Sequence, residues 1–139
     1  MMKHIILFGV AALVGVTMLG GCSKIDDTLI EPNEPGTYLQ ITHSEAKEIM
    51  DSGTECVILD VRTQEEFDEG HIKGAILLPD YEIETRAESV LTDKSQLILV
   101  YCRSGRRSKN AASELAALGY SNVKEFGGII DWPYETIVD

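Results

Sequence analysis

The sequence is poor in cations, with 12 lysines and arginines against 23 aspartates and glutamates, and its formal net charge is −11. Because contacts to phosphate backbones need Lys and Arg side chains, this balance excludes nucleic acid as a partner. The chain also lacks Cys and His clusters at metal-ligand spacing and any glycine-rich nucleotide loop, so we expect neither a metal nor a cofactor. A chain of 139 residues with no internal repeat is then expected to form one globular domain, as a monomer.

Long hydrophobic runs are also scarce, and the clearest one lies at the N-terminus. Lys3 precedes an apolar stretch from Ile5 to Leu19, which leads into Gly20-Gly21-Cys22. A short positive region before about fifteen apolar residues is typical of a secretory signal and is short for a membrane-spanning helix. The end of the stretch resembles a bacterial lipobox, so we predict a signal peptide over 1–21 and lipidation of Cys22. An uncleaved membrane anchor and a buried core helix are the alternatives.

The next segment, 22–37, is polar and contains Pro32, Pro35 and Gly36 without an apolar period. This composition favours a flexible tether that begins at the lipidated cysteine. The protein would then be extracytoplasmic, with the lipid anchor holding it on a bacterial membrane. The alternative is a structured extension that packs on the domain.

From residue 38 onward, apolar runs alternate with segments of helical pattern. Thr42 and Glu45 form a capping-box pair that begins one helix, which Gly53 ends. We expect strands at 38–41, 57–59, 75–78, 97–101 and 123–126, and further helices at 65–69, 82–91 and 108–118. The alternation predicts a three-layer α/β domain over 38–139, in which helices flank a mainly parallel sheet.

Two polar clusters follow strands of this predicted sheet, where α/β proteins place their sites. Asp60 and Arg62 end one strand, and the segment from Cys102 to Ser108 joins the strongest strand to the clearest helix. A loop entering a helix presents free N–H groups and the positive end of the helix dipole, and Gly105 allows it to turn tightly. We therefore expect the loop to stabilise Cys102 as a thiolate nucleophile. The alternative is a surface loop with an incidental cysteine.

Three motifs in this order resemble the rhodanese family. The segment Cys102-Arg103-Ser104-Gly105-Arg106-Arg107-Ser108 is similar to the family's active-site loop. Leu59-Asp60-Val61-Arg62, Glu65-Glu66-Phe67 and Gly70-His71-Ile72-Lys73-Gly74-Ala75 are similar to its first signature, and Phe126-Gly127-Gly128 with Trp132 to its last. The resemblance covers 38–139. It implies a rhodanese-like fold and a cycle in which a cysteine takes sulfane sulfur from a donor and passes it to a thiophilic acceptor.

The resemblance also implies a role for the loop residues. Cys102 would be the nucleophile and would carry the sulfur as a persulfide, which the backbone amides of 103–107 would stabilise. Arg107, with Arg103 or Arg106, would attract a small anionic donor such as thiosulfate, and a thiol or cyanide would be the acceptor. The substrate-binding loop is therefore expected to comprise Arg103, Ser104, Gly105, Arg106, Arg107 and Ser108.

Three residues outside the loop are expected to support it. Asp60 would hold the loop by bonding its backbone or an arginine, and Arg62 would pair with a nearby acid such as Glu66. His71 is expected to bond backbone and fix a turn rather than act as a base. Cys56 should lie about 13 Å from Asp60 along its strand, so we expect a core cysteine without a disulfide to Cys102.

Two other functions fit parts of the same pattern. A cysteine-dependent phosphatase or arsenate reductase has five residues between its cysteine and its arginine, whereas four residues separate Cys102 from Arg107. A non-catalytic rhodanese module would bind partners or sense redox state, and loss of the cysteine would have favoured it. The cysteine is present, so sulfur transfer is the function that the sequence predicts.

Overall fold

The computed structural model describes residues 25–139. The predicted signal peptide over 1–21 and the predicted lipidation site Cys22 lie outside the described residues. Within 25–139, no helix combines the length and the apolar character needed to cross a membrane.

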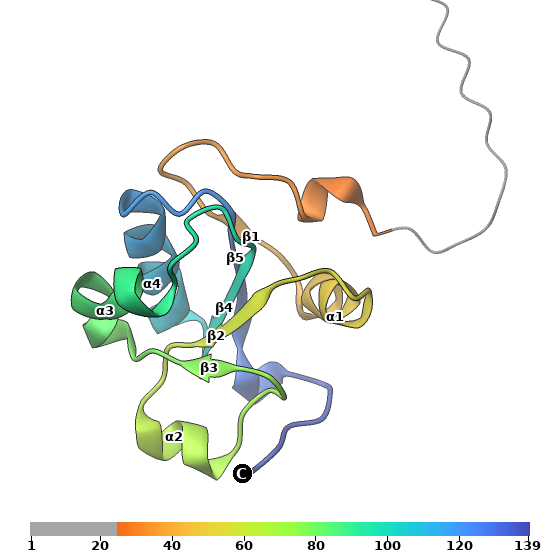
Figure 1. Ribbon diagram of the computed structural model, residues 1–139. Coiled ribbons are helices and arrows are strands. Elements are labelled where there is room, and N and C mark those ends of the chain that lie inside the picture. Colours follow the sequence, from red (N-terminus) through yellow and green to blue (C-terminus); the bar gives the residue numbers. More distant parts are fainter. Residues whose placement is uncertain (1–24) are drawn as a thin grey trace, which may run out of the picture.

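A sheet of five parallel strands forms the centre of the described domain (Figure 1). The order across the sheet is β1-β5-β4-β2-β3, which places β4 in the middle. All residues of β4 are buried, as expected for a continuously apolar strand covered on both faces. The predicted parallel α/β architecture is confirmed. The strands are β1 (Leu39–Gln40), β2 (Val57–Asp60), β3 (Ile76–Leu77), β4 (Ile98–Cys102) and β5 (Val123–Gly128).

Helices cover both faces of the sheet and complete the three layers. Helix α1 (His43–Asp51) buries Ala46 and Ile49 against one face, while α3 (Ile83–Val90) and α4 (Arg106–Ala117) cover the other (Figure 1). Helix α2 (Gln64–Glu69) follows β2, and a capping box between Thr63 and Glu66 begins it. Three short 3-10 helices complete the elements: η1 (Asp27–Leu29), η2 (Asp80–Glu82) and η3 (Ile129–Asp131).

Strand alternation decides which side chains can meet at the end of β4. Ile98, Val100 and Cys102 belong to the buried cluster on the α3–α4 face, whereas Leu99 and Tyr101 belong to the cluster on the α1 face. Cys102 therefore faces the start of α4, while its neighbour Tyr101 faces away from that helix.

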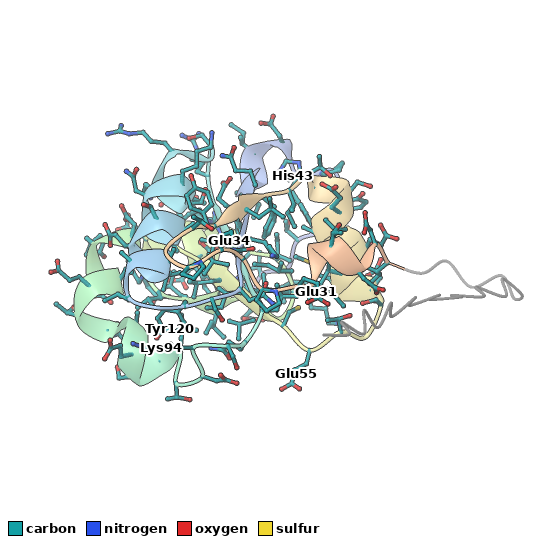
Figure 2. The ribbon with its side chains drawn as sticks, turned by 90° about the horizontal axis from the view of Figure 1, so that it is seen from above. Glu31, Glu34, His43, Glu55, Lys94 and Tyr120 are labelled. Carbon is teal, nitrogen blue, oxygen red and sulfur yellow. The ribbon has the colours of Figure 1, made fainter. Side chains whose placement is uncertain are left out.

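The segment before β1 differs from the flexible tether expected over 22–37. In the described part, 25–37, Leu29 is buried and Ile25 and Ile30 pack against the cluster on the α1 face. Figure 2 shows Glu31 and Glu34 on this segment, which runs beside the domain. The alternative of a packed extension therefore holds for these residues, because their few apolar side chains find a place in the core.

Polar contacts from β5 and the turn before it fix the same extension. The buried ammonium of Lys124 donates to the carbonyl oxygen of Glu31 and to the side chain of Asn33. The Asn122 amide donates to the carbonyl oxygen of Ile30 at 2.8 Å, and the Asn33 amide donates to that of Val123 at 2.7 Å. Burial lowers the pKa of Lys124, so the extension supplies acceptors that this cation needs.

Several element boundaries differ from the sequence prediction. Helix α4 begins at Arg106, two residues before the predicted start at Ser108, because Gly105 takes a left-handed conformation (φ 97°) and serves as its N-cap. Strand β5 continues to Gly128 rather than ending at Phe126, and Cys102 pairs with Gly128 in the sheet register. The first difference places Arg106 and Arg107 in the first turn of α4, and the second places Gly128 beside Cys102.

Candidate active site

Cys102 lies at the carboxyl end of the central strand, and its side chain is fully buried. The Gly105 N–H donates to the Cys102 sulfur at 3.0 Å, which closes the loop around that atom. The thiol in turn donates to the Ser108 hydroxyl at 3.4 Å. Strand, loop and first helical turn thus converge on one sulfur atom.

The first turn of α4 provides further donors for a negative charge. Lys109 is the first residue of this helix whose N–H reaches a backbone carbonyl, that of Gly105. Within residues 25–139, the N–H groups of Arg106, Arg107 and Ser108 have no backbone acceptor, as expected at a helix start. Free amides and the helix dipole therefore favour an anion beside Cys102.

Two glycines of β5 allow the loop to lie this close to the sheet. A Cβ atom on Gly128 would stand 2.1 Å from the carbonyl oxygen of Arg103 and 2.6 Å from the Cα atom of Ser104. Gly127 adopts a positive φ of 95°, and a Cβ there would lie 3.2 Å from the His43 ring. The Ile130 N–H then donates to the same Arg103 carbonyl at 3.1 Å. The last predicted signature, Phe126-Gly127-Gly128, thus lies directly beneath the loop, and the loop packs against its glycines.

Glu125 belongs to the site, although the sequence analysis did not single it out. Its carboxylate is buried, and it accepts a 2.6 Å hydrogen bond from Ser108 and a 2.8 Å bond from the Gly127 N–H. Ser108 therefore joins Glu125 to the Cys102 sulfur. The sequence held one signal for it. Side chains alternate between the two faces of a strand, so the charged Glu125 must lie on the same face of the last strand as the apolar Val123.

The three loop arginines have different surroundings. Arg107 makes two hydrogen bonds to the Glu66 carboxylate, at 2.7 and 2.8 Å. These bonds lower the pKa of Glu66 to about 2 and raise the pKa of Arg107. Arg103 and Arg106 are exposed, and neither forms an ion pair within the described residues. Arg107 is therefore anchored by α2, while the other two guanidinium groups face solvent.

Arg62 pairs with a nearby acid, as predicted, but this acid is Asp60 and not Glu66, the example given. Arg62 pairs with Asp60, with Nη2 2.6 Å from Oδ2 and Nε 2.9 Å from Oδ1, because Glu66 is engaged by Arg107. Asp60 also accepts a 2.6 Å bond from the Tyr101 hydroxyl. Asp60 thus bonds an arginine as expected, but that arginine lies outside the loop, and none of the described hydrogen bonds joins the Asp60 side chain to residues 102–108.

Burial and the Asp60 carboxylate raise the pKa of Tyr101, so its phenol stays protonated and donates to Asp60. The same phenol oxygen accepts a bond from the Ile72 N–H at 3.2 Å. This buried polar cluster ties β2, β4 and the segment after α2 together beneath the loop.

His71 and Cys56 lie away from the sulfur site. The His71 ring is 2.9 Å from the Phe67 carbonyl oxygen and stacks on the Phe67 ring, which agrees with the expected bond to backbone at a turn. Cys56 precedes β2 at the opposite end of the sheet, is half-buried and forms no disulfide with Cys102. Burial raises the pKa of the Cys56 thiol, which disfavours its reactive form. Among residues 25–139, no group of His, Cys, Asp and Glu is arranged to hold a metal ion.

Together the fold and this geometry define a class: parallel α/β proteins that hold a buried cysteine in an amide-lined loop between the central strand and a helix. The chain belongs to the rhodanese family, since the family model described as "Rhodanese-like domain" matches residues 42–133. That span contains Cys102 and all of the supporting residues described above.

Relatives of known name agree with this assignment. The chain is 37% identical over 73 residues to the thiosulfate sulfurtransferase PspE of Escherichia coli, covering 52% of this chain and 70% of that protein. It is 35% identical over 96 residues to the thiosulfate sulfurtransferase GlpE of Coxiella burnetii, covering 68% of this chain and 87% of that protein. These names support sulfur transfer of the rhodanese type as the general activity.

Solved structures show the same fold. A rhodanese-like domain of the Anabaena protein Alr3790 aligns with a TM-score of 0.66 at 31% identity, covering 76% of this chain and 80% of that one. An Escherichia coli structure described as a rhodanese with anions aligns with a TM-score of 0.57 at 32% identity, covering 61% of this chain and all of that one.

Proposed function

We propose that this protein moves sulfane sulfur from a small anionic donor such as thiosulfate, through a persulfide on Cys102, to a thiol or cyanide acceptor. The observation that carries the proposal is the position of the Cys102 sulfur. It lies 3.0 Å from the Gly105 N–H, beside the amides at the start of α4 that lack a backbone acceptor. Such donors stabilise an anionic sulfur as an oxyanion hole stabilises oxygen.

The proposed cycle has two displacements on sulfur. The Cys102 thiolate attacks the outer sulfur of thiosulfate, the donor's sulfur–sulfur bond breaks, and sulfite leaves with the electron pair. The acceptor then attacks the outer sulfur of the persulfide, and Cys102 leaves again as the thiolate. The outer persulfide sulfur carries the negative charge and lies one bond further from Cβ, about 2.05 Å beyond Sγ, toward the loop amides.

The exposed guanidinium groups suit an anionic donor in an otherwise acidic protein. Arg103 and Arg106 lie on either side of Ser104 and Gly105 and are exposed to a donor, while two hydrogen bonds to Glu66 hold Arg107 in the same loop. In a chain of net charge −11, this local positive charge opposes the repulsion that a dianion would otherwise meet.

The proposal is tested with the full-length protein in detergent. Incubation with thiosulfate should add one sulfur atom to the peptide that contains Cys102, and later addition of cyanide should remove it as thiocyanate. Failure to load sulfur from thiosulfate, polysulfide and a protein persulfide would reject the proposal. Cys102-dependent hydrolysis of an aryl phosphate would favour the phosphatase instead.

Gly128, against which the loop packs, offers a second test of the proposal. Gly128→Ala is expected to slow sulfur loading by about tenfold to a hundredfold, because the new Cβ would displace the Arg103 carbonyl and the loop behind it. The same overpacking should lower the free energy of unfolding by about 1–3 kcal/mol, measured by urea denaturation.

Gly36→Ala is the matched control. It introduces a Cβ at a positive φ of 76° where no atom lies within 4 Å, so it strains the backbone without touching the loop. Stability should fall in this variant while sulfur loading stays unchanged. Equal loading rates in both variants would contradict the role assigned to Gly128.

We also propose that a lipid on Cys22 anchors the protein outside the cytoplasm. The apolar run from Ile5 to Leu19 before Gly20-Gly21-Cys22 supports this. Ile25 packs on the core, so only Ser23 and Lys24 separate the anchor from the domain. Three residue steps span at most about 11 Å, which would hold the domain against the membrane surface.

Cys22→Ser is expected to abolish incorporation of radiolabelled palmitate in a bacterial host and to prevent the removal of residues 1–21, which the mass of the protein reports. Cys56→Ser, which removes another cysteine, should leave both properties unchanged. Palmitate labelling that survives in the Cys22 variant would overturn the anchor proposal.

A further inference from the structure

The buried carboxylate of Glu125 lies behind the Cys102 sulfur, and the proposed sulfur transfer gives it no role. Glu125 is 2% exposed, and the hydroxyl of the fully buried Ser108 stands between it and Cys102. The three side chains come from β5, α4 and β4, so the fold alone brings them together.

The donor and the acceptor of each hydrogen bond that links Glu125, Ser108 and Cys102 can be assigned. A serine hydroxyl has one proton to donate and lone pairs that accept. The 2.6 Å distance indicates that Ser108 donates this proton in a hydrogen bond to the Glu125 carboxylate, since a charged acceptor makes the stronger bond. Ser108 then turns a lone pair toward the sulfur, and the 3.4 Å contact is made by the Cys102 thiol proton.

The thiolate cannot keep this arrangement. Once the Cys102 proton leaves to water, the sulfur keeps the hydrogen bond from the Gly105 N–H, but Ser108 can bond the sulfur only by turning its own proton toward it. Glu125 then loses its shortest hydrogen bond. The carboxylate would keep the Gly127 N–H at 2.8 Å and the Gln40 amide at 3.5 Å. Two buried anions would then face each other across one hydroxyl, which is unfavourable.

We propose that Glu125 is a positioning residue that, through Ser108, opposes ionisation of resting Cys102, against the Gly105 N–H that favours the thiolate. This inference rests on the proposed function only in taking Cys102 as the reactive sulfur. The loaded enzyme escapes the restraint, because a persulfide carries its charge on the outer sulfur and leaves Sγ neutral. Glu125 therefore opposes the free thiolate, which is open to oxidation, without opposing the sulfur-carrying form.

Three other titratable side chains line, with Glu125, a cleft of about 400 Å³. They are His43 from α1, which Figure 2 labels, Lys109 from α4 and Asp131 from η3. Within the described residues none of them forms an ion pair with Glu125. Within the described residues, the carboxylate therefore has no cation in direct contact, and the Ser108 hydroxyl is its nearest hydrogen-bond donor.

The test is the pH dependence of Cys102 alkylation by iodoacetamide in the full-length protein, read by mass spectrometry of the Cys102 peptide. Glu125→Gln keeps an acceptor for Ser108 and removes the charge. Below the midpoint of the pH profile, this variant should be alkylated about tenfold faster than the wild type, with the midpoint about one pH unit lower. An unchanged or slower rate would overturn the proposal.

Two further variants separate the hydroxyl link from general charge effects. Asp131→Asn removes a negative charge from the same cleft without a bond to Ser108, so its profile should stay within about twofold of the wild type. In a Ser108→Ala background, Glu125→Gln should change the rate by less than about twofold, because the link is absent. A tenfold effect that persists without Ser108, or an equal effect of Asp131→Asn, would refute the link. Alkylation needs no sulfur donor, so this test can fail while the proposed sulfur transfer holds.

Discussion

Replacing Cys102 with alanine is expected to abolish thiocyanate formation from thiosulfate and cyanide, with a loss of roughly a thousandfold or more. Among residues 25–139, Cys102 is the cysteine whose sulfur lies beside the loop amides. The proposed cycle has no other atom that can form the persulfide. The measurement is the initial rate of thiocyanate release, with the mass of the Cys102-region peptide as a direct readout of loading.

Cys56→Ala is the matched control for this loss. Cys56 lies at the opposite end of the sheet, and burial raises the pKa of its thiol. Its removal should leave the rate of thiocyanate release within about twofold. If the Cys102 variant kept its activity while the Cys56 variant lost it, the site would be misassigned.

Asp60→Ala is expected to lower the free energy of unfolding by about 3–5 kcal/mol. Asp60 is fully buried, and Arg62, at 5% exposure, has its charge balanced there by two close hydrogen bonds. The substitution leaves that guanidinium charge buried with the Gly70 carbonyl as its remaining acceptor and also removes the acceptor of the Tyr101 hydroxyl. Urea denaturation followed by circular dichroism measures the change.

Asp51→Ala makes the same substitution at an exposed pair. Asp51 bonds Lys47 one helical turn away, and its side chain is 63% exposed, so the expected change is below about 1 kcal/mol. Similar losses in both variants would contradict the view that burial gives the Asp60 pair its weight. Folded Asp60→Ala protein should still load sulfur, because Asp60 does not touch the Cys102 sulfur.

The loop from Cys102 to Ser108 could be predicted because its signals are local. Strand, cysteine, Gly105 and helix follow one another within 97–118, and each has a physical signature at short range. The same holds for the capping boxes at Thr42 and Thr63, although only the first was recognised. Helix α4 begins earlier than predicted because the Gly105 conformation, rather than the apolar pattern, decides where it starts.

Contacts between distant parts of the chain were beyond the same reasoning. Glu66 was assigned to Arg62, four residues away, yet it binds Arg107 from across 41 positions. Ser108 and Glu125 are separated by 17 positions and by the sheet register. The tether prediction failed over 25–37 because polar composition is not a measure of packing, and a few apolar side chains such as Leu29 sufficed to dock the segment.

The sequence by itself determined the layered α/β class, the position of the loop and the place of Cys102 at its start, because periodicity and turn chemistry act over a few residues. Only the tertiary structure decided what surrounds the sulfur: the glycines at the end of β5, the pairing of Arg107 with Glu66, and the carboxylate of Glu125 behind Ser108. Those neighbours depend on which face of each buried strand meets which helix, and side-chain alternation across a five-strand register fixes this only once the sheet has formed.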